Sequence, residues 1–234
     1  MIEGVDVSDK QGAINWRAVA SSGRSFAFIR VSDGAGHPDT RFAANWPAAK
    51  AAGLIRGVYQ YFEPAENPIA QADLLLQRTG GVAIGDLPPT IDVETLGSTN
   101  SPAATADAVA TWVDYVHRKT SLNPIVYASP SFWAQLPARG IERKAMLWVA
   151  NWGVSKPTVP GAWNRWAFWQ YSSAGSVPGI TVPVDLDRFE GNSIDLRLIT
   201  RGGMMKIAGV GVAGAGAAAL VGLGAFLLIG SRKK

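Results

Sequence analysis

Short apolar and β-branched runs recur along the chain, separated by polar, glycine-rich or proline-rich stretches. Runs of this length that end at turn residues are typical of buried strands. The pattern predicts eight strands, at residues 2–8, 26–32, 55–62, 89–94, 124–129, 146–151, 166–172 and 182–189.

Several of these runs are separated by stretches with helical spacing of apolar residues. Helices are predicted at 40–52, 67–78, 101–120 and 130–136, and the third of them opens with Ser-Pro, a helix start signal. The later connection at 153–165 is rich in Pro, Gly and Trp and is expected to be a loop. Alternating strands and helices favour an α/β fold, a parallel (β/α)8-like barrel with eight strands and a reduced set of helices. An open doubly wound sheet is the main alternative.

The C-terminal part of the chain has a different pattern. Residues 207–229 carry no charge, and a helix over this stretch would span about 34 Å, enough to cross a bilayer. The alternatives are a glycine-rich tail or a buried hairpin. The sequence therefore predicts a catalytic barrel at 1–200, a short linker at 201–206, a transmembrane helix at 207–230 and a basic tail at 231–234.

Composition narrows the possible classes of protein. A chain of 234 residues, 47% hydrophobic and 17% charged, is long enough for one α/β domain with a substantial core. It has no cysteine, which excludes disulfides and thiolate metal sites. The net charge of +4 includes three basic residues at the C-terminus, and no basic stripe with interleaved aromatics is visible. We therefore expect no nucleic-acid partner.

The N-terminus lacks the pattern of a cleavable secretion signal.

Candidate chemistry begins with the segment PTIDVETLG at 89–97. Asp92 and Glu94 are two residues apart at the end of an apolar run, so in a strand they point to the same face, with Cα atoms roughly 7 Å apart. Like charges at this separation are costly unless a substrate, a shared proton or a cation uses them. The pair is a candidate site, and a solvated strand end is the alternative.

In a barrel, further acids converge on the same place. Asp6 lies in the first strand, Asp33 just after the second and Asp185 in the last, and barrel active sites form where the strands end. Such a mouth could hold a hard cation or hydrolyse a glycosidic bond. The two histidines, His37 and His117, give little support to a metal site, so we expect no metal and no cofactor. Aromatic residues at strand ends favour a sugar ligand: Tyr59, Tyr61, Tyr127, Trp148, Trp152, Trp169 and Tyr171.

Five segments in order make a specific resemblance. They are GVDVS at 4–8, the stretch from Asp39 through AAGLIRGVYQYF, TIDVE at 90–94, LWVANW at 147–152, and WQYSSAG with VDLDRF within 169–189. Over about residues 2–190 the chain resembles the glycoside hydrolase family 25 lysozymes, which are N-acetylmuramidases. The resemblance implies a barrel with few helices and cleavage, with retention of configuration, of the β-1,4 bond between N-acetylmuramic acid and N-acetylglucosamine in peptidoglycan.

The resemblance also implies roles for individual residues. Glu94 matches the family's general acid, and Asp92 and Asp6 would supply the negative surroundings that raise its pKa. Asp92 would also stabilise an oxocarbenium-like transition state or orient the substrate's acetamide group, and Asp185 matches a supporting acid. The positions that match sugar-binding residues are Tyr61, Tyr127, Trp152 and Gln170, with Asp33 at the edge of the subsites.

Two segments depart from the pattern of the family. Arg30 and Asp33 stand where many relatives carry Lys and Glu, which keeps the charge pattern and alters the subsite geometry. Asp187 often corresponds to an amide in relatives, and it is expected to add a negative charge near the mouth.

The expected partners are bacterial peptidoglycan and, through residues 207–230, a lipid bilayer. A wall substrate combined with a membrane segment suggests a lysin of a phage or phage-like particle, associated with the virion or with other lysis proteins. Two alternatives remain: a non-catalytic wall-binding protein on the same barrel, and a membrane-permeabilising protein whose glycine-rich segment is the effector.

Overall fold

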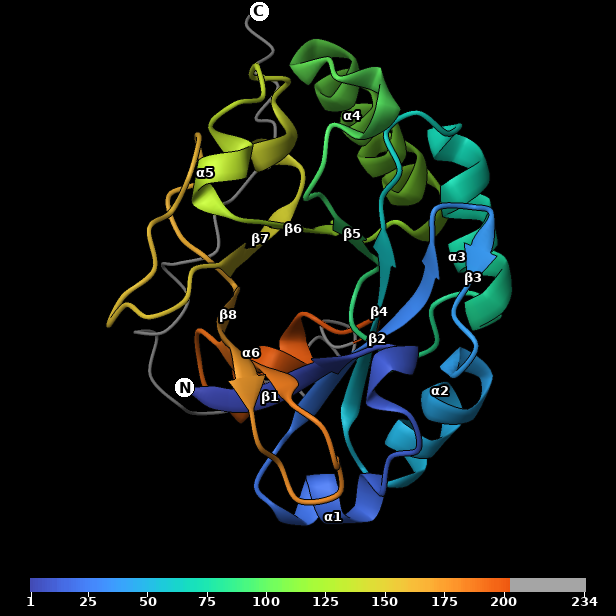
Figure 1. Cartoon of the computed structure of the whole chain (residues 1–234), viewed down its shortest axis with the longest axis vertical. Coiled ribbons are helices and arrows are strands. Elements are labelled where there is room, and N and C mark those ends of the chain that lie inside the picture. The colour runs from blue at the N-terminus through green and yellow to red at the C-terminus, as the bar shows by residue number, and fades with distance from the viewer. Residues whose placement is uncertain (203–234) are drawn as a thin grey trace, which may run out of the picture.

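The computed structural model describes residues 1–202 (Figure 1). The predicted transmembrane helix at 207–230 and the basic tail at 231–234 lie outside the described residues. Within residues 1–202, no helix combines the length and the apolar character needed to span a membrane.

A closed ring of eight strands forms the centre of the fold (Figure 1). Neighbours pair in the order β1, β9, β8, β7, β6, β5, β4, β2, and the pairing of β1 with β2 closes the ring. The barrel predicted from the sequence is therefore confirmed. A ninth short strand, β3 (His37–Pro38), forms a hairpin on β2 outside the ring. The ring strands are β1 (Ile2–Val7), β2 (Phe26–Asp33), β4 (Ile55–Tyr61), β5 (Thr90–Asp92), β6 (Ile125–Ala128), β7 (Met146–Ala150), β8 (Phe168–Gly175) and β9 (Val184–Phe189).

The last strand corrects the expectation of an all-parallel barrel. β9 runs antiparallel to both of its neighbours, β1 and β8. A parallel return requires a crossover of about a dozen residues or more. Residues 176–183 are too few for that crossover, and with Pro178, Gly179 and Pro183 they form a hairpin connection instead. The N-terminal end of β9 therefore lies beside the C-terminal ends of the other ring strands.

Helices cover the outside of the ring. The helices predicted at 40–52, 67–78 and 101–120 are present to within two residues, whereas the one at 130–136 ends at Trp133. The loop expected at 153–165 has no helix or strand. Helices α1 and α6 were not predicted, and both are only about two turns long. The helices are α1 (Trp16–Ser21), α2 (Phe42–Ala51), α3 (Pro68–Thr79), α4 (Pro102–Thr120), α5 (Pro130–Trp133) and α6 (Ser193–Leu198).

Large aromatic side chains fill one end of the barrel interior. Phe26, Phe28 and Phe168 are fully buried, and Phe28 stacks on Trp148 with ring centroids 4.2 Å apart. A Cβ atom at Gly4 would lie 2.4 Å from the Phe26 ring, so this strand position has room only for glycine. The packing closes one end of the barrel and leaves the other end open.

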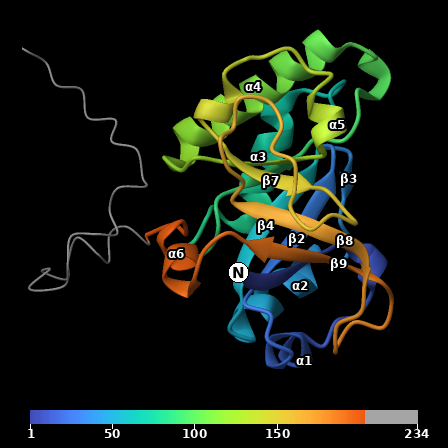
Figure 2. The same cartoon turned by 90° about the vertical axis from the view of Figure 1, so that its left-hand side faces the viewer.

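Helix α6 packs at the closed end. It follows β9 along the chain (Figure 2). Its Leu196 packs in the aromatic cluster inside the barrel. The end of the barrel that carries α6 is called the closed end below, and the opposite end, where the parallel strands finish, is called the mouth.

Candidate active site

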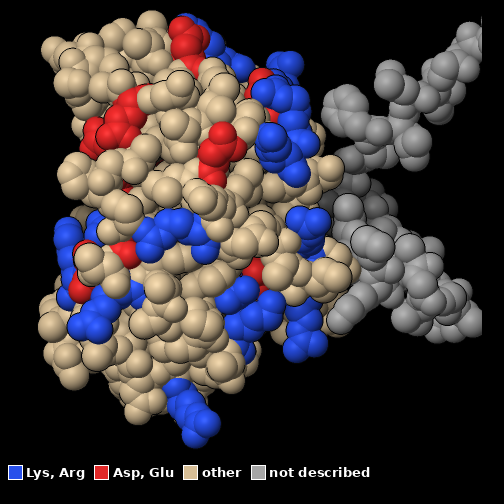
Figure 3. Space-filling view, turned by 90° about the vertical axis from the view of Figure 1, so that its right-hand side faces the viewer, with Lys and Arg blue, Asp and Glu red and all other residues tan. Residues whose placement is uncertain are grey.

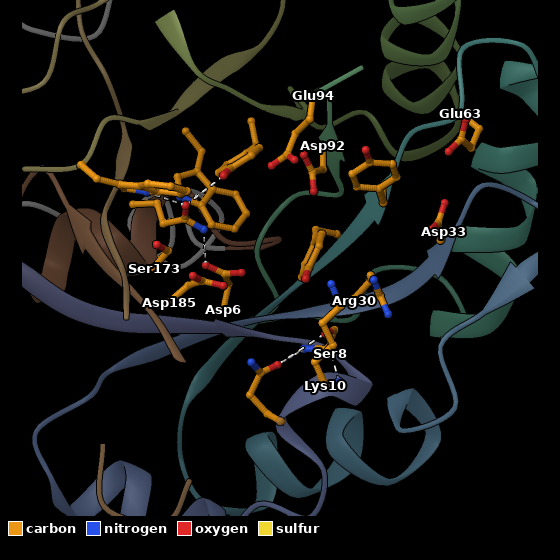
Figure 4. Close-up of a pocket in the computed structure, with 17 residues that line it drawn as sticks. Asp6, Ser8, Lys10, Arg30, Asp33, Glu63, Asp92, Glu94, Ser173 and Asp185 are labelled. Atoms are coloured by element: carbon orange, nitrogen blue, oxygen red, sulfur yellow. Dashed lines mark hydrogen bonds between the residues drawn. The ribbon is translucent and has the colours of Figure 1, made fainter. Parts of the chain in front are cut away.

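The mouth contains a cavity of about 610 Å³ (Figure 4). The strands place their end residues around it because parallel strands that close into a barrel finish at one rim. The structure places all nine site residues predicted from the sequence on its wall: Asp6, Asp33, Tyr61, Asp92, Glu94, Tyr127, Trp152, Gln170 and Asp185. Asp33 is the last residue of β2 rather than the first residue after it.

Asp92 and Glu94 face this cavity from the end of β5 (Figure 4). Val93 between them is buried, and its N–H donates to the carbonyl of Tyr127, which fixes the backbone just after the strand. Asp92 is buried, and one of its oxygens has no hydrogen-bond partner among the described residues. The Glu94 side chain is open to solvent. The pair therefore consists of one enclosed and one accessible carboxyl group.

Both carboxyl groups have a raised pKa. Burial raises the pKa of Asp92 well above its usual value, the nearby Glu94 raises it further, and Arg30 opposes the shift. Desolvation by the cavity walls raises the pKa of Glu94, while the polar hydroxyl of the neighbouring Tyr127 lowers it. A carboxyl group with a raised pKa holds a proton that it can donate near neutral pH.

A second group of acids lies on β1 and β9. Asp6 is directly opposite Asp185 across the antiparallel pair, and Asp187 is two residues along on the same face. Burial and the Asp187 and Asp185 charges raise the pKa of Asp6 well above its usual value. The pKa of Asp185 is raised to about 6, chiefly by burial. Asp6 and Asp185 line the cavity on the side across from β5 (Figure 4).

The structure corrects the expectation for Asp187. Its side chain is fully buried below the mouth, and it accepts a hydrogen bond of 2.8 Å from Nε1 of Trp148. Burial raises its pKa well above the usual range, which favours the neutral acid. Asp187 is therefore a buried polar group beneath Asp6, and it is not a free charge at the mouth.

Gln170 connects Asp6 with the aromatic wall of the cavity. Its Oε1 accepts hydrogen bonds from the Tyr127 hydroxyl at 2.9 Å and from Nε1 of Trp152 at 3.0 Å. Its Nε2 donates to Oδ2 of Asp6 at 2.8 Å. The Gln170 side chain is buried, so these three bonds fix the orientation of its amide.

Arg30 provides a positive charge beside the acids. Its Nη2 donates to Asp9 at 2.7 Å and its Nε donates to Asp39 at 3.0 Å, which holds the guanidinium group at the cavity wall. Six carboxyl groups line the cavity, whereas Lys10 and Arg30 are its two basic residues.

The predicted aromatic residues divide into two sets. Tyr59, Tyr61, Tyr127, Trp148 and Trp152 line the cavity. Trp169 and Tyr171, which flank Gln170, lie on the outer face of the barrel, so these two aromatics of the predicted set do not line the cavity. Trp169 packs on Trp166 and donates to the carbonyl of Asn151, and the Tyr171 hydroxyl donates to Glu3. Because side chains alternate along a strand, an inward Gln170 places both neighbours outside.

Several cavity residues were missed by the sequence analysis. They follow β1 and β4 or lie in β8, and the visible signals were the polar run SDKQ after the first strand and the Glu of YFEP after the third. Glu63 lies beside Asp33, and burial together with the Asp33 charge raises its pKa. The missed residues are Ser8, Lys10, Gln11, Glu63 and Ser173.

The described residues contain no group of three or more His, Cys, Asp or Glu arranged to hold a metal ion. His37 is exposed on β3, and His117 is exposed with Nδ1 2.9 Å from the carbonyl oxygen of Leu122. Both histidines lie outside the mouth cavity.

Comparisons with known proteins agree with this geometry. The family model for glycosyl hydrolases family 25 matches residues 5–180. Lysozyme M1 of Streptomyces globisporus is 37% identical over 210 residues, covering 83% of this chain and 70% of that protein. An N,O-diacetylmuramidase of Arthroderma benhamiae is 28% identical and covers 86% of this chain and 88% of its own length.

A solved structure agrees as well. The crystal structure of the bacterial lysozyme from Streptomyces coelicolor superimposes with a TM-score of 0.82 at 35% sequence identity, covering 86% of this chain and 98% of that one. The acid-lined mouth, the barrel and these matches together show that the chain belongs to glycosyl hydrolase family 25 and is a glycoside hydrolase of the lysozyme (muramidase) type.

Proposed function

We propose that this enzyme cleaves the β-1,4 bond between N-acetylmuramic acid and N-acetylglucosamine in bacterial peptidoglycan, with Glu94 as the general acid. The observation that carries the proposal is the pairing of an accessible carboxyl group, Glu94, with an enclosed one, Asp92, on one wall of the mouth cavity. Glycoside hydrolysis requires two carboxyl groups in different environments that flank one bond.

Glu94 protonates the leaving glycosidic oxygen. It is suited to this step because it reaches solvent and substrate while its raised pKa keeps it protonated to a higher pH than a free glutamate. After cleavage, the Glu94 carboxylate accepts a proton from the water that completes hydrolysis, since the acid and base roles alternate on one residue in retaining enzymes.

Asp92 acts on the sugar that is cleaved from the leaving oxygen. Its carboxyl group lines the cavity beside Glu94, where it can stabilise positive charge at the sugar ring or accept a hydrogen bond from the N–H of the substrate's acetamide group. Arg30 favours the ionised form of Asp92 that either role requires. Asp6 and Asp185 complete the negative surroundings.

The cavity walls suit a sugar chain. Trp152 is 52% exposed at the rim, and its indole is held by Gln170, so a flat aromatic face is presented in a fixed orientation. A second hollow continues past Trp152 between Ser129, Ser131 and Asn151, which extends the groove beyond one sugar unit.

Muropeptide analysis tests the catalytic proposal. Purified peptidoglycan is digested with the full chain in mild detergent and, in parallel, with Glu94→Gln. New fragments with reducing N-acetylmuramic acid from the parent and none from Glu94→Gln would support the proposal. Reducing N-acetylglucosamine ends would assign a different bond, and no new ends from either protein would favour a wall-binding module.

We further propose that residues 207–230 anchor the enzyme in a membrane and that it serves as a lysin of a phage or phage-like particle. The support is the uncharged sequence from Ile207 to Ile229 and its basic flanks. The chain leaves the barrel at Gly202 on the closed end, so an anchor there leaves the mouth unobstructed.

A wash of membranes at alkaline pH tests the anchor. Retention of the full chain, with release of a variant that ends at residue 206, would support it. Dye release from liposomes by the isolated tail peptide, absent for the variant without the tail, would instead favour the permeabilising role. Normal lysis timing or infection by a strain that encodes the shortened variant would contradict the proposed use of the anchor.

A further inference from the structure

The mouth cavity and the outer surface of the closed end differ in their charged residues. Six of the eight charged residues around the mouth cavity are acids. At the closed end, the segments that precede the parallel strands, together with the chain after β9, carry exposed basic side chains. In Figure 3 the closed end is on the right, and Lys and Arg side chains gather along that edge. This closed-end surface comprises Lys50, Arg118, Lys119, Arg143, Lys144, Arg165, Arg197 and Arg201.

Acids at the closed end neutralise a minority of these charges. Lys144 pairs with Asp114 at 2.8 Å and Lys50 pairs with the buried Asp86 at 3.3 Å. Asp195 is engaged in capping α6. Within residues 1–202, the other six basic residues of the surface form no ion pair.

Helix polarity explains part of this surface. Basic residues in the last turn of a helix interact favourably with its carbonyl end, which accounts for Lys50 in α2 and for Arg118 and Lys119 in α4. Arg165 and Arg201 lie in loops, where this effect does not operate. Their position at the closed end calls for another explanation.

Exposed apolar side chains lie where the chain leaves this surface. The backbone of Arg201 exchanges hydrogen bonds with Gly85 and Asp86, and Gly202 lies against Ile84. Ile84 is 68% exposed, and Ile194 on α6 is 64% exposed. Two exposed isoleucines beside a basic surface are typical of a protein face that contacts the headgroup region of a bilayer.

We propose that the closed-end surface docks on a bilayer that contains anionic phospholipids, so that the mouth faces away from the membrane. The inference rests on the proposed membrane anchor. Residues 203–206 separate the described barrel from the uncharged segment, and four residues reach at most about 14 Å. A barrel tethered so closely at its closed end keeps Arg197 and Arg201 near the membrane surface, where anionic headgroups attract basic side chains.

The absence of native cysteine allows a clean probe of orientation. The full chain is labelled with a fluorophore at Ile194→Cys on the closed end or, as the matched control, at Ala174→Cys on β8 near the mouth. Each protein is reconstituted in vesicles of phosphatidylcholine alone or mixed with phosphatidylglycerol, and quenching by acrylamide is measured. We expect the anionic lipid to reduce quenching severalfold at position 194 and to leave position 174 unchanged.

Charge reversal separates docking from anchoring. Arg197→Glu with Arg201→Glu, or high salt, is expected to restore quenching at position 194, whereas the alkaline wash still retains the protein and peptidoglycan digestion in detergent is unchanged. Equal quenching at position 194 in both lipid mixtures, with retention intact, would overturn the docking proposal and leave the anchor standing. Loss of retention would overturn the anchor and the docking together. The muramidase activity would be unaffected by that result, because muropeptide analysis tests it separately.

Discussion

Asp6 and Asp185 lie directly opposite each other on two antiparallel strands, β1 and β9, and both face the mouth cavity. Two carboxyl groups in this arrangement cannot both ionise at low cost, because like charges directly opposite on neighbouring strands destabilise the pair. Burial and the charges of Asp187 and Asp185 raise the pKa of Asp6, whereas burial and the Glu94 charge raise the pKa of Asp185 and a hydrogen bond with Asp6 lowers it.

The stability of the protein should therefore depend on Asp185. Its folded pKa of about 6 lies above the reference value of 3.8, so the folded state binds more protons between these values. This group then lowers the free energy of unfolding as pH rises from about 4 to 6. Asp185→Asn should increase the free energy of unfolding at pH 7.5 by on the order of 1–2 kcal/mol, a value reduced because the Asp185 side chain is partly exposed to solvent. The same substitution should have little effect at pH 4. Calorimetry at the two pH values checks this, and an equal change at both would contradict it.

Glu94→Gln should lower kcat by roughly 10²–10⁴-fold and leave binding of peptidoglycan fragments nearly unchanged, because the amide keeps the shape and loses the proton. The fall of kcat/KM at high pH in the parent should follow the ionisation of Glu94, whose pKa is raised by desolvation. Digestion rates across pH, with fragment binding by calorimetry, measure both quantities. A mutant that retained the parent's rate would assign the acid role elsewhere.

Asp187→Asn should be well tolerated, whereas Asp187→Leu should not. The amide can accept from Trp148 and donate to Asp6, but leucine leaves the Trp148 N–H unpaired in the core, at a cost of about 1–3 kcal/mol. Thermal denaturation and kcat/KM of the two variants form the test. A large loss of activity in Asp187→Asn would mean that the proton of Asp187 itself takes part in the reaction.

Gln170→Leu should weaken substrate binding more than it slows the chemical step. The change removes the acceptor that holds Trp152 and Tyr127 and the donor to Asp6. We expect KM to rise by about tenfold as the rim indole loses its fixed orientation. Steady-state kinetics on a soluble substrate is the measurement, and Trp152→Phe is the matched control. A fall in kcat with unchanged KM would contradict this role.

Arg56→Met should destabilise the barrel by about 3–5 kcal/mol without changing kcat/KM of the folded protein. Arg56 and Asp86 form a two-point ion pair at 2.9 and 3.0 Å, both side chains are buried, and the guanidinium lies 3.8 Å from the Trp46 ring centre. Removing Arg56 leaves the buried Asp86 carboxylate with Lys50, at 3.3 Å, as its remaining ion-pair partner. Urea denaturation and kinetics are compared, and the double variant with Asp86→Leu should recover part of the loss.

The periodicity of the sequence was sufficient for the elements and for one half of the site. All eight ring strands and the helices at 42–51, 68–79 and 102–120 follow from local spacing and helix start signals. Asp92 and Glu94 face the same cavity because their separation of two places them on one side of an extended chain. These features depend on residues close together in the chain, so local patterns record them.

The other half of the site depends on tertiary structure. Asp185 was expected at the mouth of a parallel barrel, but a parallel strand would have placed this early residue of β9 at the closed end. It reaches the mouth because β9 runs antiparallel. The burial of Asp187 depends on Trp148, a residue 39 positions away on another strand.

The sequence by itself determined the strands, the main helices and the acidic pair on β5, since each is encoded within a few consecutive residues. Tertiary structure alone decided that Gln170 faces inward while Trp169 and Tyr171 face outward, and that exposed bases gather at the end of the barrel opposite the acidic mouth. The alternation of side chains along a strand defines two faces, but it does not determine which face is buried. Charges separate between the two ends of the barrel only when segments that are distant in the chain meet at the same rim.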